Sequence, residues 1–262
     1  MSDSSDEETA GLFDEPEGFY QPEKEPTFVT HRMLNGDDLK LRLVGHNALW
    51  LHKGHLLWNA GRTLADYLES HSSTLIEGGT ILELGAGAGL PSLICAIRGA
   101  KQVVVTDYPD AELIENLQYN IEHCPLLTTP PNVAAEGYLW GAPTSSLTSH
   151  LPRTETGGRF DLLILADLLF NHSEHSKLLS TVQQMLSTTS EARALVFFTP
   201  YRPWLLEKDL AFFDLATEGG FVVKKIFEKV MEKVMFEEDP GDELLRRTVF
   251  GYSLRWSIGT SQ

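Results

Sequence analysis

Short apolar runs alternate with amphipathic stretches through most of the chain. The apolar runs have the length of β-strands, and they lie at residues 80–84, 102–107, 133–140, 160–167 and 194–198. The stretches between them repeat apolar residues at helical spacing, at 90–99, 110–123, 173–186 and 203–218. Strands that alternate with helices predict a parallel α/β sheet. The run at 160–167 is almost continuously apolar, which is typical of a strand buried on both faces of such a sheet.

The last part of the chain follows a different pattern. Residues 221–236 and 247–256 are β-like, and the acidic segment 237–242, which contains Pro and Gly, separates them. With no helix between them, these runs predict an antiparallel hairpin that extends the sheet. The expected fold is therefore a Rossmann-like α/β fold, with a seven-stranded, mostly parallel sheet and a C-terminal antiparallel hairpin.

The region before the first sheet strand contains two further elements. Residues 26–45 alternate in part around Asn35-Gly36, which predicts a small β-hairpin outside the main sheet. Residues 54–71 carry apolar residues on one helical face and predict the first helix. Trp58 lies close to that face. Because a helix in this position often covers the ligand edge of the sheet, Trp58 either lines the site or packs as a core tryptophan.

The length of 262 residues suits one α/β domain with a tail. Residues 1–25 are acidic and offer little to bury, so we expect a disordered tail. Phe13, Phe19 and Tyr20 interrupt the acidic run; these rings dock onto the domain, dock onto a partner, or stay mobile. The expected organisation is a tail over 1–25, a hairpin extension over 26–53 and one domain over 54–262.

The charge and the cysteine content restrict the class of protein. The formal net charge of −16 argues against non-specific nucleic-acid binding and suits a basic partner, with solubility alone as the alternative. No window has the apolar length of a membrane span, and the two cysteines imply no disulfide framework. We therefore expect a soluble, cytoplasmic, monomeric protein that binds neither membranes nor nucleic acid.

A glycine-rich motif follows the first sheet strand. Gly85, Gly87 and Gly89 alternate with alanines between the apolar run and a helix-like stretch, and glycines allow a ligand to approach the backbone closely. Asp107 ends the next strand, where a carboxylate accepts hydrogen bonds from ribose hydroxyls in nucleotide-binding α/β folds. Ligands bind outside the carboxyl ends of the strands. Further candidates at that edge are Trp140, Asp167 and the turn 199–201.

The spacing of the glycines bears on the choice of cofactor. The dinucleotide fingerprint requires G-x-G-x-x-G, whereas Leu90 occupies its third glycine position here. Glu83 places an anion beside the loop, which would repel a pyrophosphate but could accept a hydrogen bond from a cationic amino group. S-adenosylmethionine carries such a group and no phosphate. The sequence therefore favours S-adenosylmethionine over NAD.

Four segments, in order along the chain, resemble the protein-lysine methyltransferase family 16 group of seven-strand enzymes. They are LGAGAGLP at 84–91, VTDY at 105–108, WG at 140–141 and ADLLF at 166–170. The resemblance covers residues 40–256 and implies a class I methyltransferase fold. The acidic residues 1–17 and the segments 43–46, 48–58 and 105–110 are similar to the fungal group that methylates the N-terminus and a nearby lysine of elongation factor 1-alpha. That group was earlier described as nicotinamide N-methyltransferase.

The resemblance implies a set of cofactor contacts. S-adenosylmethionine would contact Trp58, the backbone of Gly85, Ala86 and Gly87, and the residues Asp107, Trp140 and Ala166. Glu83, the expected acceptor for its amino group, would lie beside them.

Methyl transfer is mainly a task of aligning a neutral amine with the methyl group. Asp167 is the candidate to orient the amine and to accept its proton through water; the alternative is a cap for the helix that follows its strand. Phe170 and Tyr201 are candidates to wall the channel and to favour a cationic product, with core packing as the alternative. The pair His172 and His175, like His52 and His55, lacks matching ligands at recognised spacing, so we expect surface histidines and no metal.

Three classes of function remain open at this point. The first is a protein N-methyltransferase that acts on a basic translation factor, expected to be elongation factor 1-alpha. The second is a small-molecule N-methyltransferase that acts on nicotinamide, and the third is a non-catalytic cofactor-binding module. The acidic charge favours the first class over the second, and the element 167–170 favours catalysis over the third.

Overall fold

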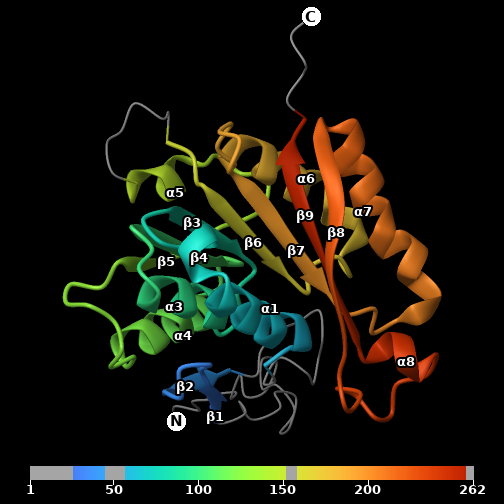
Figure 1. The fold of residues 1–262 in the computed structure, drawn as a ribbon, viewed down its shortest axis with the longest axis horizontal. Helices are drawn as coiled ribbons and strands as arrows, with labels where there is room; N and C mark the ends of the chain where they lie inside the picture. The colour runs from blue at the N-terminus through green and yellow to red at the C-terminus, as the bar shows by residue number, and fades with distance from the viewer. Residues whose placement is uncertain (1–25, 45–56, 152–157, 258–262) are drawn as a thin grey trace, which may run out of the picture.

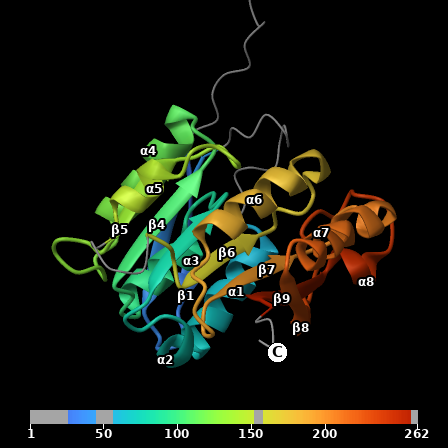
Figure 2. The ribbon, with the colours of Figure 1, turned by 90° about the horizontal axis from the view of Figure 1, so that it is seen from above.

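A seven-stranded sheet with helices on both faces dominates the computed structural model, which describes residues 26–44, 57–151 and 158–257 (Figures 1 and 2). Its strand order is β5-β4-β3-β6-β7-β9-β8. The strands are β3 (Thr80–Leu84), β4 (Gln102–Asp107), β5 (Val133–Gly137), β6 (Leu162–Ala166), β7 (Arg193–Phe198), β8 (Phe221–Val230) and β9 (Thr248–Trp256). The α-helices are α1 (Asn59–Ser70), α2 (Ser72–Leu75), α3 (Leu90–Ile97), α4 (Ala111–Glu122), α5 (Ser145–Ser149), α6 (His175–Met185), α7 (Leu206–Glu218) and α8 (Glu243–Arg246).

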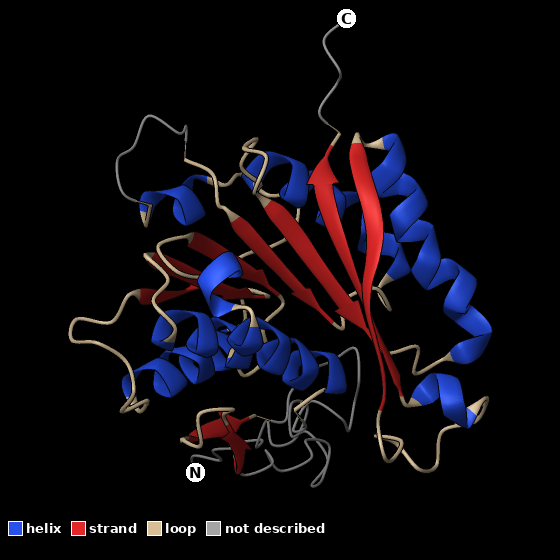
Figure 3. Ribbon diagram, in the orientation of Figure 1, coloured by secondary structure: helices blue, strands red, loops and turns tan. Residues whose placement is uncertain are grey.

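The pairing of the strands confirms the predicted fold class. The neighbours from β5 to β7 are parallel, whereas β9 runs antiparallel between β7 and β8 (Figure 3). β8, next to β9 at the end of the strand order, is an edge strand of the sheet. Three lysines along β8, Lys224, Lys225 and Lys229, are exposed, and charged residues on an edge strand discourage pairing with another chain.

Two apolar cores form because successive side chains of a strand point to opposite faces of the sheet. Ile81 and Val103 pack with α1, α3 and α4 on one face. Leu82 and Val104, one residue further along each strand, pack with α6 and α7 on the other. Both faces are covered, so the central strands must be apolar throughout, as the sequence of β6 is.

The N-terminal hairpin forms a two-stranded antiparallel sheet of its own, made of β1 (Thr27–Arg32) and β2 (Asp38–Leu43). Leu39 and Leu41 are buried in the same core as α1 and α3. The Arg42 amide donates to Asn120 Oδ1 on α4 at 2.7 Å. The hairpin therefore packs directly on the main core. The division into 1–25, 26–53 and 54–262 stays a prediction, and the tail and residues 45–53 lie outside the described residues.

Several boundaries differ from the prediction. The strand expected over 133–140 ends at Gly137, because the chain turns after the Tyr138 amide has bonded the Asp107 carbonyl. The strand expected over 221–236 ends at Val230. Two short helices, α5 and α8, lie in stretches for which no helix was predicted, and the Asp242 side chain caps α8 by accepting from the Leu245 amide at 3.0 Å.

The order of the strands places the candidate site. Along the chain, β3, β4 and β5 are laid down in one direction across the sheet, and β6 and β7 in the other. The switch point lies between β3 and β6, whose carboxyl ends lead into the glycine loop and into Asp167. Ligands of open α/β sheets bind at such a point. Within the described residues, no helix is both long and apolar enough to cross a membrane.

Candidate active site

The glycine loop combines close packing with an open backbone. Gly85 and Gly87 have φ values of 60° and 57°, which side chains rarely adopt. A Cβ on Gly85 would come within 2.6 Å of Leu168 Cδ2, whereas a Cβ on Gly87 would meet nothing within 4 Å. The Ala86 amide is fixed by the Thr106 carbonyl at 2.9 Å. The loop is therefore rigid beneath Gly85 and leaves room for a ligand at Gly87.

Asp107 lies beside this loop, as predicted from its position at the end of β4. Its Oδ2 accepts from the Gly87 amide at 2.6 Å, and its Oδ1 accepts from the Tyr108 amide at 2.7 Å. Burial raises the pKa of Asp107, and the two amides oppose that rise. A carboxylate has about four acceptor positions, so two remain for the hydroxyls of a ribose.

Glu83, which was expected to accept a hydrogen bond from the cofactor, is hydrogen-bonded within the protein. It is 1% exposed, and its Oε2 accepts from both the amide and the hydroxyl of Ser92 in the first turn of α3. Burial raises the pKa of Glu83 to about 8, so the group is mostly neutral near pH 7. The contact of Glu83 with a cationic amino group stays a prediction.

Asp167 caps a helix, but not the helix that follows its strand. It comes directly after β6 with φ at 53°, in the left-handed region. Its Oδ2 accepts from the Ala60 amide at 2.9 Å, in the first turn of α1, and its Oδ1 accepts from the Thr199 amide at 2.8 Å. The Tyr201 hydroxyl donates to the same Oδ2 at 3.3 Å and accepts from the Asn59 amide at 3.2 Å. Asp167 and Tyr201 together anchor the start of α1 to the sheet edge.

Burial also changes the protonation of this pair. It raises the pKa of Asp167 to about 7, against the hydrogen bonds from Ala60, Thr199 and Tyr201, which lower it. It raises the pKa of the Tyr201 hydroxyl well above its usual value, so this phenol stays protonated. Asp167 can therefore gain or lose a proton near neutral pH, whereas Tyr201 remains a donor.

Trp58, the residue before α1, is the centre of an aromatic cluster. Its ring lies 6.2 Å from Phe170 in a stacked arrangement, 5.1 Å from Tyr201 and 5.7 Å from Phe236, measured between centroids. Phe236 comes from the segment between β8 and β9, which no sequence pattern had assigned to the site. The structure thus brings the three predicted aromatic residues together around Asp167 and adds a fourth.

Trp140 and Ala166 flank the glycine loop. Trp140 Cζ2 would lie 3.4 Å from a Cβ on Gly85, so the ring packs against the loop. Ala166 is the last residue of β6, directly before Asp167, and is partly buried. The predicted site residues therefore form two neighbouring groups, one around the glycine loop and one around Asp167.

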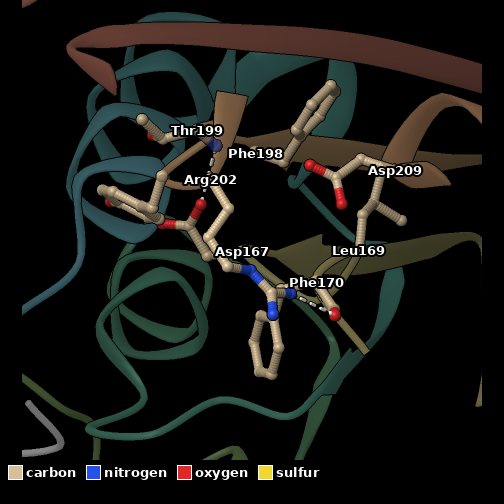
Figure 4. A pocket seen from close by; sticks show the side chains of 8 residues that line it. Asp167, Leu169, Phe170, Phe198, Thr199, Arg202 and Asp209 are labelled. Atoms are coloured by element: carbon tan, nitrogen blue, oxygen red, sulfur yellow. Dashed lines mark hydrogen bonds between the residues drawn. The ribbon is translucent and has the colours of Figure 1, made fainter. Parts of the chain in front are cut away.

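A small cavity of about 10 Å³, which is room for about one water molecule, opens beside Asp167 (Figure 4). Its lining includes two charged residues that the sequence analysis missed, Arg202 and Asp209. Arg202 Nη2 donates to the Phe170 carbonyl at 2.7 Å, and Asp209 Oδ1 lies 2.6 Å from His172 Nε2. Neither residue belongs to a motif, and only their place after β7 could have suggested them.

The expectation of surface histidines is wrong for one of the pair. His175 is 4% exposed, and its Nε2 lies 2.8 Å from the Leu169 carbonyl, to which it donates. Burial lowers the pKa of His175. Among residues 26–44, 57–151 and 158–257, no three His, Cys, Asp or Glu side chains gather as a metal site requires. His52 and His55 lie outside the described residues.

Comparison with known families identifies the chain. Residues 37–218 match the model of a family described as lysine methyltransferase. The chain belongs to that family. It is 52% identical over 246 residues to the protein N-terminal and lysine N-methyltransferase efm7 of Aspergillus fumigatus, covering 94% of this chain and 93% of that protein. The enzyme of the same description from Schizosaccharomyces pombe is 43% identical over 258 residues, covering 97% and 98%.

Solved structures agree on the fold. A putative S-adenosylmethionine-dependent methyltransferase from Streptococcus mutans superposes with a TM-score of 0.52 at 11% identity, over 89% of this chain and 57% of that one. Trm5b from Pyrococcus abyssi superposes with a TM-score of 0.50 at 18% identity, over 88% and 56%. The protein is an S-adenosylmethionine-dependent protein N-methyltransferase. The open backbone at Gly87 and the acceptor oxygens of Asp107 suit the adenosine part of that cofactor.

Proposed function

We propose that this methyltransferase modifies the N-terminal amine and a nearby lysine of elongation factor 1-alpha. The observation that carries the proposal is the similarity, over nearly the whole chain, to fungal enzymes described as protein N-terminal and lysine N-methyltransferases. The resemblance of segments 43–46 and 105–110 to the group that acts on this factor supports the choice of target. The net charge of −16 suits a basic substrate. In this proposal the enzyme is a monomer and acts in the cytoplasm.

The chemistry requires a neutral amine at a defined place. S-adenosylmethionine supplies an electrophilic methyl group when bound. An α-amine has a pKa of about 7.7–8.0 and a lysine about 10.4, so the N-terminus needs less help to lose its proton. The site must then position the nitrogen and accept one proton, and it needs no nucleophilic residue of its own.

In this proposal, the cofactor lies along the glycine loop and the amine enters beside Asp167. Asp107 would hold the ribose, and Trp140 and Ala166 would complete the adenosine side, with Glu83 supporting the loop from below. Both oxygens of Asp167 already accept hydrogen bonds from the protein, which supports a positioning role. The water-sized cavity next to Asp167 supports proton transfer through one water molecule.

The aromatic cluster would form the wall of the amine channel. Trp58 and Phe170 are stacked, and Tyr201 meets Trp58 edge-on at 5.1 Å. An aromatic wall attracts a fully hydrated ammonium only weakly. It attracts a methylated cation more strongly, because that cation has lost part of its hydration. Phe170 and Tyr201 would therefore favour the product as charge develops on nitrogen.

The test is methylation of an extract from cells that lack this protein, with radiolabelled S-adenosylmethionine and peptide mass spectrometry of each labelled band. We expect label at the N-terminus and a nearby lysine of elongation factor 1-alpha, and loss of label with Asp107→Ala. Asp214→Ala, on the exposed side of α7, is the matched control and should retain activity. Thermal unfolding of both variants separates loss of the site from loss of the fold.

Other outcomes distinguish the remaining functions. If nicotinamide is methylated while all protein remains unlabelled, the enzyme acts on a small molecule. If neither is labelled although S-adenosylmethionine binds, the protein is a cofactor-binding module and the role given to Asp167 is wrong. Label on a different basic protein would keep the reaction but refute the target.

A further inference from the structure

The guanidinium of Arg202 is bound to the main chain of the segment that carries Phe170. Its Nη2 donates to the Phe170 carbonyl at 2.7 Å, beside the water-sized cavity that Asp167 also lines (Figure 4). A cationic donor makes a charge-assisted hydrogen bond, which is shorter and stronger than a bond between neutral groups. Arg202 therefore fixes the point of the main chain from which the Phe170 side chain starts.

A second contact holds the same segment two residues further on. His172 Nε2 lies 2.6 Å from Asp209 Oδ1, which belongs to α7. The Asp209 side chain is only 8% exposed. Burial raises the pKa of Asp209, whereas the hydrogen bond from His172 and the charge of Arg202 lower it. These three side chains interact as a unit, which we call the charged cluster: His172, Arg202 and Asp209.

The segment held by the charged cluster carries part of the aromatic cluster. The Phe170 ring is stacked on Trp58, with 6.2 Å between the centroids. Trp58 directly precedes α1, whose first turn is anchored to Asp167. The two rings thus reach their contact from different anchors. Arg202 fixes the Phe170 side of this contact.

The place of the charged cluster suggests more than a contribution to stability. Burying charged groups carries a desolvation penalty, and apolar residues of similar volume often give equal or higher stability. Arg202 and Asp209 nevertheless line the same cavity as Asp167. We propose that Arg202 is a positioning residue for methyl transfer, which fixes the Phe170 carbonyl and thereby the ring that walls the amine channel. Asp209 and His172 support the same segment from its far end. This inference rests on the amine channel of the proposed function.

The effect of Arg202 is expected on the alignment of the amine and not on the binding of the cofactor. The cofactor contacts at Gly87 and Asp107 belong to the separate group around the glycine loop. A displaced channel wall misaligns the amine, and a misplacement of about 1 Å can lower a rate about 100-fold. Loss of the Arg202 contact should therefore lower kcat and leave the Kd of S-adenosylmethionine nearly unchanged.

The experiment compares Arg202→Met and Arg202→Lys in the full-length chain. Methionine keeps an unbranched stem without a donor, whereas lysine keeps the charge and a donor. Relative to the unaltered enzyme, kcat should fall about 10- to 100-fold in Arg202→Met and less than about three-fold in Arg202→Lys. The Kd of S-adenosylmethionine and the KM of the protein substrate should change less than about two-fold in both. Lys208→Met, at an exposed lysine of α7, is the matched control and should leave kcat unchanged.

A double variant separates positioning through Phe170 from a general structural role. Phe170→Ala removes the ring on which Arg202 is proposed to act. Adding Arg202→Met to Phe170→Ala should then lower kcat less than about two-fold further, because residues that act through one another are not additive. A residue that only stabilises the fold would lower kcat by the same factor in both backgrounds.

Several results would overturn the inference. They are an unchanged kcat in Arg202→Met, an equal loss with and without the Phe170 ring, a loss of cofactor affinity that matches the loss of kcat, and no recovery in Arg202→Lys. If Arg202→Met fails to fold, Asp209→Asn repeats the comparison. Its loss of kcat should be about 3- to 10-fold and should again disappear in Phe170→Ala.

The outcome for Arg202 is distinguishable from the outcome for the proposed target. Each kcat is measured on the substrate that the unaltered enzyme labels. A different labelled protein would refute elongation factor 1-alpha as the target, and the comparison of variants would still test Arg202. Label on elongation factor 1-alpha with an unchanged kcat in Arg202→Met would instead retain the proposed function and refute the positioning role.

Discussion

Gly85 and Gly87 lie two residues apart with the same left-handed backbone, yet their surroundings differ. We expect backbone strain alone to lower the free energy of unfolding by about 1 kcal/mol or more in both Gly85→Ala and Gly87→Ala. Gly85→Ala must also displace Leu168, whose Cδ2 would lie 2.6 Å from the new Cβ, and should add about 1–3 kcal/mol of overpacking. Gly87→Ala should instead weaken S-adenosylmethionine binding, because its Cβ enters the open side of the loop.

Denaturant unfolding and calorimetric titration with the cofactor separate these two effects. The expected result is a larger loss of stability for Gly85→Ala, measured without cofactor, and a loss of affinity for Gly87→Ala in a protein that remains folded. Equal stability of the two variants would contradict the packing argument. Unchanged affinity in Gly87→Ala would contradict the placement of the ligand.

Glu83 predicts a pH dependence of stability. Its carboxyl has a pKa of about 8 in the folded chain and an ordinary value near 4.5 when unfolded. Between these values the unfolded state binds fewer protons, so the free energy of unfolding falls as the pH rises from about 5 to about 8. Glu83→Gln keeps an acceptor for Ser92 without a titrating group. Its stability relative to the wild type should increase over this range by on the order of 3 kcal/mol. Parallel curves of unfolding free energy against pH would refute the assignment.

At the scale of elements, the start of α1 depends on residues far away in the sequence. Trp58, at the N-cap position, makes no side-chain cap, so Asp167 and Tyr201 supply the acceptors for the first amides. Tyr201→Phe should lower the free energy of unfolding by about 1 kcal/mol, because the Asn59 amide loses its acceptor. Asp167→Asn should cost about 1–3 kcal/mol, because its new NH₂ would face either the Ala60 or the Thr199 amide.

Hydrogen exchange at the Asn59 and Ala60 amides checks this anchoring beside denaturant unfolding. Faster exchange there in both variants, together with reduced methylation, is expected, since the displaced helix carries Trp58. Asp214→Asn, on the exposed side of α7, should change neither quantity. Protection that stays at the wild-type level in Asp167→Asn would show that α1 is held by packing alone.

The elements that the sequence predicted correctly are those with a local signal. The strand–glycine loop–helix over 80–99 and the placement of Asp107 next to Gly87 follow from spacing and from the rule for strand ends. The partner of Asp167 did not follow, because Ala60 lies 107 residues earlier and its contact depends on how α1 crosses the sheet edge. Phe236 was missed for a related reason: the pattern placed it at the end of a strand over 221–236, whereas it follows the end of β8 in an irregular segment, and only the tertiary fold brings it to Trp58.

At the scale of the whole molecule, the charge is unevenly distributed. Residues 1–25 carry nine of the acidic residues and only one lysine, whereas three cationic residues, Arg193, Lys224 and Arg255, lie together at the end of the strands remote from the site. The acidic residues are therefore the groups expected to attract a basic substrate.

Salt dependence of the kinetics tests that last point. If the acidic surface draws a basic protein to the site, raising the ionic strength from about 0.05 M to about 0.5 M should raise KM about ten-fold and leave kcat nearly unchanged, since screening acts on encounter and not on the aligned amine. A short neutral peptide with the same N-terminus is the control, and its KM should change little. A KM for the protein substrate that is independent of salt would show that the net charge of −16 serves solubility alone.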